Sequence, residues 1–295
     1  MSGHDAEFSA RDAEANADAS SGVGLPMAEP APAAAGTEAS PDATVLSSPE
    51  GNEPVAAVPT ASQAQPQQTA STEIYVAGVR LVADCEGALY WPDEGALIVA
   101  DLHLEKGSSY ATRGVLLPPY DTAATLARLA ELIGRYAPKA VIALGDSFHD
   151  GDGPMRLGDA DRAALLALQR GRDWLWVAGN HDPDPSKHVA GSFAATLAIG
   201  PLLFRHAPQA GAVSGEVAGH LHPVARVSGR GRTVRRRCFV SDRRRVILPA
   251  FGAYAGGLNV RDQAFAEIFG NLAFTAHMLG KARVYAFAAT HCLAD

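Results

Sequence analysis

The hydrophobic positions of the chain switch between short continuous runs and helical spacing. Continuous apolar runs at 96–100, 140–144 and 174–178 predict strands that are covered on both faces. Apolar residues recur at helical spacing within 120–136, and a second helix fits 159–170. This β-α-β-α-β order predicts parallel strands with right-handed crossovers, and therefore an α/β fold.

Strand patterns flank this unit on both sides. Before it, we expect a strand over 74–82, with a turn or bulge at Gly78, and a short strand over 88–91. After it, the pattern is strand-rich, with strands expected at 195–204, 216–218, 233–240, 246–249 and 283–288.

Residues 1–72 differ in composition from the rest of the 295-residue chain. They are rich in Ala, Pro, Ser and acidic residues, with Phe8 as their single aromatic residue. Such a segment buries too little apolar surface to offset its ordering entropy, so we expect a disordered extension over 1–72 and one domain over 73–295. The segment holds 10 of the 32 acidic but 1 of the 25 basic residues, which leaves a nearly neutral domain.

The three cysteines are scattered and form no CxxC pair. This pattern argues against a disulfide framework and a zinc–thiolate site, and it fits a reducing cytoplasm. We find no signal-peptide pattern and no apolar stretch long enough to span a bilayer, so we expect a cytoplasmic protein without a membrane partner.

Residues able to bind a metal directly follow the three central strands. In an open α/β sheet the carboxyl ends of the strands form the ligand crevice. The candidates there and further along the chain are Asp101-x-His103, Gly145-Asp146, Gly179-Asn180-His181-Asp182, His206 and His220-x-His222. Oxygen and imidazole ligands without thiolates suit Mn, Fe, Zn or similar ions.

The spacing of these residues makes mechanical sense for two ions. If the first strand continues, Asp101 and His103 point the same way and reach one ion, and the same holds for His220 and His222. A carboxylate such as Asp146 can join two ions about 3.5–4 Å apart, which together activate water and stabilise the attacking and leaving oxygens of a displacement. Each motif alone is a weak signal, but five in order favour a metal site.

The order D-x-H, G-D, G-N-H-D, H, G-H-x-H resembles the calcineurin-like metallophosphoesterase superfamily, whose fold is a two-sheet β-sandwich flanked by helices. The resemblance implies one ion held by Asp101, His103, Asp146 and His222, and a second held by Asp146, Asn180, His206 and His220. It also implies that His181 contacts the phosphate and protonates the leaving group, and that Asp182 orients His181.

A narrower resemblance covers roughly residues 73–290. The segments that carry it are Asp101–Ser108, Arg113-Gly114, Leu117–Asp121, Gly145–Asp150 and Leu248–Tyr254. They are similar to the bacterial DNA-ligase-associated DNA-damage-response phosphoesterases, regarded as manganese-dependent endonucleases that prefer single-stranded DNA. The resemblance implies two divalent ions, most often Mn²⁺ with Fe, Zn, Ni or Co as alternatives, and a DNA ligase or helicase repair system as partner.

Residues 226–245 contain nine arginines and one acidic residue, Asp242. Arg235, Arg236 and Arg237 form candidate phosphate contacts, although a solvated hairpin kept soluble by its charges is the alternative. Arg113 and His149 are further candidates for substrate contact, since each follows a metal motif closely. The alternative for Arg113 is pairing with Glu105 or Asp121, and His149 is equally compatible with an ordinary loop histidine.

Three functions fit these features. The first is a metal-dependent phosphodiesterase that cuts single-stranded DNA in repair. The second keeps the same site but acts on a small phosphoester such as a nucleotide or cyclic nucleotide. The third is a non-catalytic scaffold, which the complete set of ligand types and His181 argue against.

Overall fold

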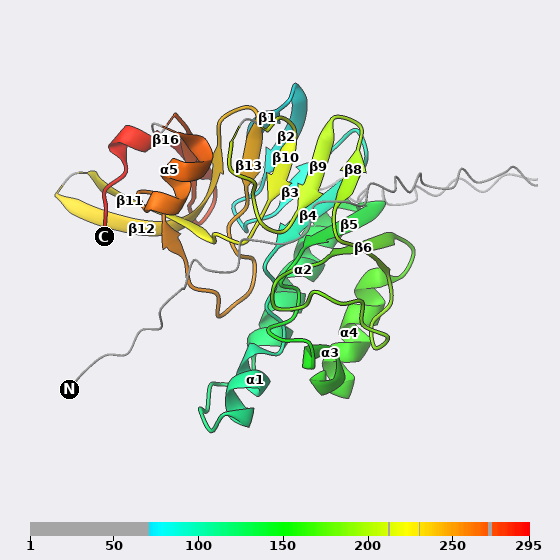
Figure 1. Cartoon of the computed structure of the whole chain (residues 1–295). Coiled ribbons are helices and arrows are strands. Elements are labelled where there is room, and N and C mark those ends of the chain that lie inside the picture. The colour runs from blue at the N-terminus through cyan, green and yellow to red at the C-terminus, as the bar shows by residue number, and fades with distance from the viewer. Residues whose placement is uncertain (1–70, 212, 230, 271–272) are drawn as a thin grey trace, which may run out of the picture. The chain divides into compact units, whose positions relative to one another are not determined.

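The computed structural model describes residues 71–211, 213–229, 231–270 and 273–295, all within one compact unit (Figure 1). The extension predicted over 1–72 ends too late, because Thr72 already begins the first strand; for residues 1–70 the prediction of disorder lies outside the described residues. In the described part of the chain, no helix combines the length and the apolar character that crossing a membrane requires.

The first sheet has seven strands in the order β1-β2-β3-β4-β5-β6-β7. They are β1 (Thr72–Val76), β2 (Val79–Ala83), β3 (Leu89–Trp91), β4 (Ala96–Ala100), β5 (Ala140–Leu144), β6 (Asp173–Val177) and β7 (Ser192–Ala194). Strands β1 to β4 pair antiparallel, whereas β4 to β7 pair parallel. The predicted parallel unit is confirmed, and the strand expected over 74–82 is a hairpin that turns at Ala77-Gly78.

Helices α2 (Asp121–Tyr136) and α4 (Asp159–Gln169) cover the outer face of the first sheet (Figure 1). Leu126, Leu129 and Leu132 of α2 are buried with residues of β4 and β5 in one apolar cluster. Each fully buried leucine contributes about 1.5–3 kcal/mol, so this face anchors the strands that carry the first site motifs. The sequence did not predict the short helices α1 (Lys106–Thr112) and α3 (Gly153–Arg156).

The second sheet has nine strands, in the order β14-β11-β12-β13-β10-β9-β8, with β15 pairing with β12 and β16. They are β8 (Leu197–Ile199), β9 (Leu202–Arg205), β10 (Glu216–Ala218), β11 (Pro223–Gly229), β12 (Arg232–Ser241), β13 (Arg245–Ile247), β14 (Leu258–Asn259), β15 (Thr275–Leu279) and β16 (Val284–Ala288). The single strand expected over 195–204 is wrong: β8 and β9 form a hairpin with Gly200 in the left-handed region at its turn.

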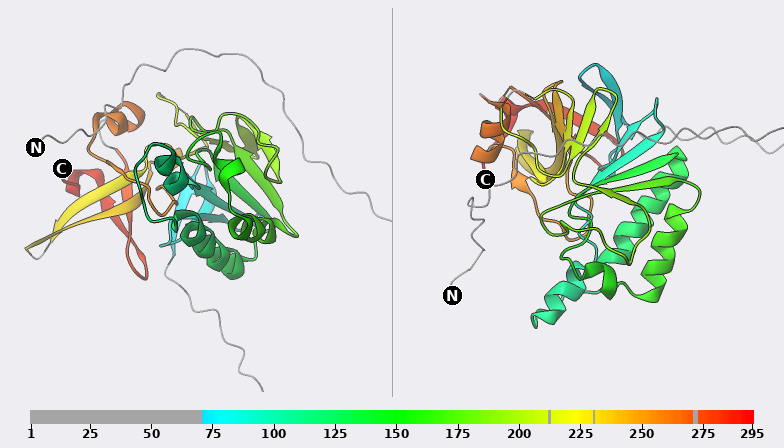
Figure 2. Two further views of the ribbon diagram at one scale, coloured as in Figure 1. Left: turned by 90° about the horizontal axis from the view of Figure 1, so that it is seen from below. Right: turned by 45° about the vertical axis from the view of Figure 1, so that its right-hand side comes forward.

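The two sheets pack face to face around a shared core (Figure 2). Ile98 and Leu144 of the first sheet lie in one buried cluster with Phe204, Phe239 and Leu248 of the second half of the chain. On the far face of the second sheet lie α5 (Gln263–Phe269) and the 3₁₀ helix Ala289–His291. The predicted two-sheet sandwich flanked by helices is confirmed.

Candidate metal centre

The carboxyl ends of strands from both sheets meet at one site. In the first sheet Ala100, Leu144 and Val177 are in register, so Asp101 and Asp146 emerge side by side at the strand ends. In the second sheet β9 and β10 are parallel, and the N–H of Gly219 donates to the carbonyl of His206. Both oxygens of Asp101 accept the N–H of His220, at 3.2 and 3.0 Å, which fixes the turn between β10 and β11 against β4.

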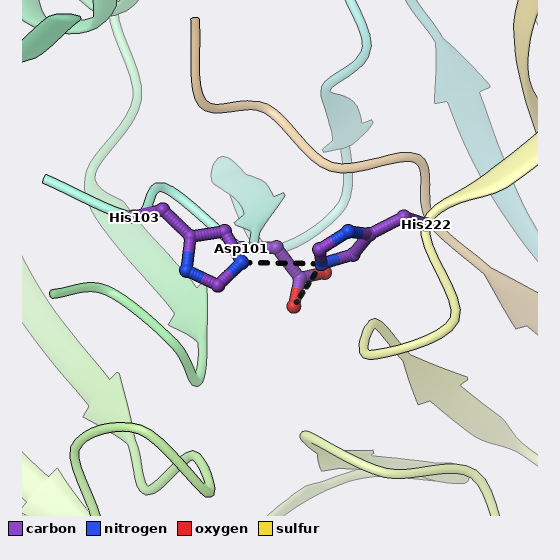
Figure 3. Close-up of side chains that lie close together, drawn as sticks. All are labelled: Asp101, His103 and His222. Atoms are coloured by element: carbon purple, nitrogen blue, oxygen red, sulfur yellow. Dashed lines mark hydrogen bonds and ion pairs between the residues drawn. The ribbon is translucent and has the colours of Figure 1, made fainter. Parts of the chain in front are cut away.

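Asp101, His103 and His222 form the first cluster. Figure 3 shows their side chains pointing toward one another. Nε2 of His222 lies 3.2 Å from Oδ1 of Asp101 and 3.2 Å from Nε2 of His103. Asp101 and His103 are buried, and the side chain of His222 is 20% exposed, which leaves this cluster open on one side.

Asp146, His206 and His220 form the second cluster. Nε2 of His206 lies 3.4 Å from Oδ1 of Asp146, 3.0 Å from Nδ1 of His220 and 2.8 Å from Oδ1 of Asn180. The other ring nitrogen of His206 donates to the carbonyl of Leu144 at 3.0 Å. Oδ2 of Asp146 lies 3.9 Å from Nε2 of His103, so this carboxylate stands between the two clusters.

The donor atoms fit two divalent cations. Within each cluster the candidate ligand atoms lie within 4.8 Å of one another. Two imidazole nitrogens face each other at 3.2 Å in the first cluster and at 3.0 Å in the second. A cation beside each pair would accept a lone pair from both nitrogens. The structure therefore brings together all seven residues that the sequence predicted as ligands.

The charge states of the buried groups suit the binding of cations. Burial, with the neighbouring His222, lowers the pKa of His103 to about 2, so its ring is neutral. Burial acts to raise the pKa of Asp146, but hydrogen bonds with His206 and the N–H of His181 hold it below its ordinary range. Burial acts to lower the pKa of His206, yet Asp146 and Asp101 raise it to about 9. A cation in the second cluster therefore takes the place of a proton.

The ligand triplets have a backbone that the sequence did not predict. Strand β4 ends at Ala100, and Asp101 and His103 have φ of 54° and 44°. His220 and His222, at 70° and 45°, repeat this alternation. The expected strand continuation is wrong, because left-handed residues, not strand alternation, aim both side chains at the site. Each such non-glycine residue costs roughly 1–2 kcal/mol, so strain is concentrated at this site.

Two glycines allow the strand ends to approach. Gly145 has φ 66°, and a Cβ there would lie 2.6 Å from the ring of His206. A Cβ on Gly179 would collide with the backbone nitrogen of Asp146. The glycines of the G-D and G-N-H-D motifs therefore make room for the ligands that follow them.

His181 lies at the edge of both clusters. Its Nδ1 is 2.8 Å from the carbonyl of His149, and its Nε2 is 3.9 Å from Oδ2 of Asp146. Because a carbonyl only accepts, Nδ1 carries a proton and Nε2 is the atom that faces the site.

Asp182 has a different role from the one expected. Its Oδ2 accepts the N–H groups of Ser147 at 2.8 Å and Phe148 at 3.1 Å, and thus clamps the loop after Asp146. Burial raises the pKa of Asp182 to about 7. The expectation that Asp182 orients His181 is corrected: the carbonyl of His149 does so, because Asp182 is directed toward the β5 loop.

The proposed substrate contacts fall into two groups. His149 lies at the site, with its ring stacked on His181 at a centroid distance of 5.1 Å, and burial lowers its pKa to about 4. Arg113, exposed at the end of α1, is close enough for its charge to act on His149. Arg235, Arg236 and Arg237 lie instead on β12, outside both clusters.

Tyr110 is a site neighbour that the sequence did not predict. Its ring centroid lies 5.5 Å from that of His149, which extends the stack on His181. Tyr110 lies on α1, whose Gly-Ser-Ser segment carries no helical periodicity. The only signal in the sequence was that this segment follows the first motif closely.

Comparison with known proteins agrees with this geometry. A family model described as calcineurin-like phosphoesterase matches residues 96–236, which include every ligand of both clusters. The chain is similar to the crystal structure of the nuclease MPE of Pseudomonas putida, with 29% sequence identity and a TM-score of 0.57, over 74% of this chain and 100% of that one. No curated protein matches the chain. Residues 96–236 form a calcineurin-like phosphoesterase domain, and the chain is a phosphoester hydrolase.

Proposed function

We propose that this protein is a divalent-metal-dependent phosphodiesterase that hydrolyses DNA, acting as a single-strand endonuclease in DNA repair. One observation carries the proposal: two adjacent ligand clusters meet at Asp146, and the imidazole of His181 stands at their edge. The similarity to a nuclease supports a nucleic-acid substrate.

The proposal assigns each cluster one ion. Asp101, His103, Asp146 and His222 would hold the first, and Asp146, Asn180, His206 and His220 would hold the second. Nitrogen and oxygen donors fit Mn²⁺ and also accept Fe, Zn, Ni or Co. When bound, the ions supply an activated water at neutral pH and neutralise charge on the phosphoryl oxygens.

His181 acts as the general acid in this proposal. Hydrolysis joins a water oxygen to phosphorus and breaks the bond to the leaving oxygen, which must gain a proton. The carbonyl of His149 accepts the N–H at Nδ1, so the protonated ring donates its second proton from Nε2. His149, stacked on this ring, keeps its plane fixed.

A divalent-metal screen of the purified full chain tests the proposal. Circular single-stranded DNA and a chromogenic phosphodiester are assayed side by side after chelation and reloading with each metal. We expect Mn²⁺-dependent cutting of the circle, which only an endonuclease can open. Turnover of the small ester with intact DNA would move the function to small-molecule phosphoester hydrolysis.

The repair role is tested in cells. A strain lacking this protein is expected to be sensitive to DNA damage, and the wild-type chain but not a His181→Ala variant to restore resistance. Loss of a DNA ligase or helicase of the same system should add no further sensitivity. Three buried cysteines without disulfides support a reducing cytoplasm as the site of action.

A further inference from the structure

A cationic pocket lies beside the first cluster. It has a volume of about 450 Å³ and is bordered by Arg235, Arg236 and Arg237 of β12 and by Lys281 of the turn between β15 and β16. Glu86 is the single carboxylate on its wall. Four cations against one carboxylate make a site for an anion, and guanidinium groups bind phosphate with paired hydrogen bonds.

Two of the arginines are held in place by backbone carbonyls. Nη1 of Arg237 donates to Ala250 at 2.8 Å, and Nη2 of Arg235 donates to Gly257 at 2.9 Å. These bonds use one donor of each fork and leave the others for a ligand. The ion pair of Arg235 with Asp295, at 3.4 Å, joins two side chains about half exposed and competes weakly with a phosphate.

The pocket shares a wall with the metal centre. The segment 252–257 begins where the N–H of Gly252 donates to the carbonyl of Asp101, and after it the N–H of Leu258 donates to the carbonyl of His222. Nζ of Lys106 donates to the carbonyl of Tyr254, midway along the segment, at 3.2 Å. One side of this segment therefore meets the ligand triplets, and its end at Gly257 borders the cationic pocket.

The hairpin of β11 and β12 projects from the rest of the second sheet, as Figure 1 and the left view of Figure 2 show. Arg226 faces Arg235 across it, and Arg232 lies nearer its tip, so positive charge continues along the hairpin from the pocket. A polymer with regularly spaced phosphates matches this line of charge better than a small ester, which would occupy one position.

We propose that the pocket formed by Arg235, Arg236, Arg237 and Lys281 is a second phosphate subsite, which holds a phosphodiester of the DNA strand away from the bond that is cut. This inference rests on the proposed function and adds the path of the strand: from the metal centre across segment 252–257 to the pocket. The subsite supplies binding and not chemistry.

The test measures binding without cleavage. The full chain is kept in EDTA, and its affinity for thymidine monophosphate, a short oligothymidylate and a long one is measured by fluorescence competition. The test variant is Arg235→Gln/Arg236→Gln/Lys281→Gln, which spares the half-buried Arg237. The matched control Lys139→Gln/Arg170→Gln/Arg244→Gln removes three exposed charges outside the pocket.

We expect the test variant to bind the long strand about tenfold more weakly, with a salt slope smaller by about 2, and the control to match wild type. Equal affinities of test variant and wild type for the long strand overturn the subsite. An equal loss for the monophosphate and the long strand assigns the pocket to a free nucleotide and also overturns it.

Cleavage assays separate this inference from the proposed function. With metal restored, the test variant should lose cutting of DNA through a raised KM, while its turnover of a chromogenic phosphodiester stays within about twofold of wild type. If wild type binds the long strand through the pocket but does not cut it, the proposed function fails and the subsite stands.

Discussion

The two ligand clusters are built from the same residue types but are held very differently. In the second cluster His206 is tied at one nitrogen to the carbonyl of Leu144 and surrounded at the other by Asp146, Asn180 and His220. In the first cluster, Nδ1 of His103 is buried without a partner among the described residues, and His222 is partly exposed. The protein itself orders the second cluster, whereas the first depends on what it binds.

Removing the carboxylate of Asp146, which lies between the clusters, should lower turnover the most. Asp146→Ala is expected to lower turnover by about a thousandfold or more, because the several kcal/mol contributed by both ions are lost. Elemental analysis should show that the ion content of the variant falls at both clusters. Retention of one full equivalent would mean that Asp146 belongs to a single cluster.

The next largest loss of turnover is expected from His181, which lies at the edge of both clusters. His181→Ala should lower DNA cleavage about a hundredfold to a thousandfold and leave the metal content unchanged. A chromogenic ester, whose leaving group needs no proton, should lose far less. Similar losses with both substrates would contradict the role of general acid.

Stability should distinguish the clusters directly. In EDTA, His206→Gln is expected to lower the free energy of unfolding by about 2 kcal/mol, because the buried carbonyl of Leu144 loses its donor and Asp146 loses one of its partners. His103→Gln, the matched variant, should cost clearly less, because Nδ1 of His103 has no described partner to lose and Nε2 loses only its close contact with the partly exposed His222. Denaturant unfolding measures both, and equal losses would contradict the difference in order between the two clusters.

Asp182→Asn should lower metal affinity or turnover less, and it tests whether Asp182 supports the second cluster or His181. Its carboxylate clamps the N–H groups of Ser147 and Phe148, so the variant is expected to lose about tenfold in metal affinity or turnover through a looser Asp146 loop. The test substrate should not matter, since both esters need Asp146. A loss confined to poor leaving groups would instead return Asp182 to the support of His181.

The smallest effect lies outside both clusters. His277, on β15, is buried beside Ser241, and burial lowers its pKa to about 4. At this residue the unfolded chain binds a proton as pH falls below about 6.5 while the folded chain does not, so His277 by itself accounts for a loss of about 1 kcal/mol of stability between pH 7 and pH 5.5. His277→Gln should remove this pH dependence in EDTA without changing turnover; an unchanged slope would contradict it.

The parts of the fold that follow from hydrophobic pattern were predictable. Strands β4 and β5 and helix α2 have almost the predicted bounds, and the ligands stand at the strand ends where topology puts them. The β8–β9 hairpin was missed although Gly200-Pro201 marks its turn. The left-handed backbone of Asp101 and His103, and the true partner of Asp182, depend on contacts between distant segments, which no local pattern records.

His220 and His222 belong to different clusters yet come from one three-residue turn, pinned by Asp101 beneath it. When one imidazole is captured by an ion, the turn loses the freedom that the other would have to give up. If the site takes up two ions, the entropy of ordering this turn is lost when the first ion binds, so the second ion binds with a smaller entropic cost than it would have alone.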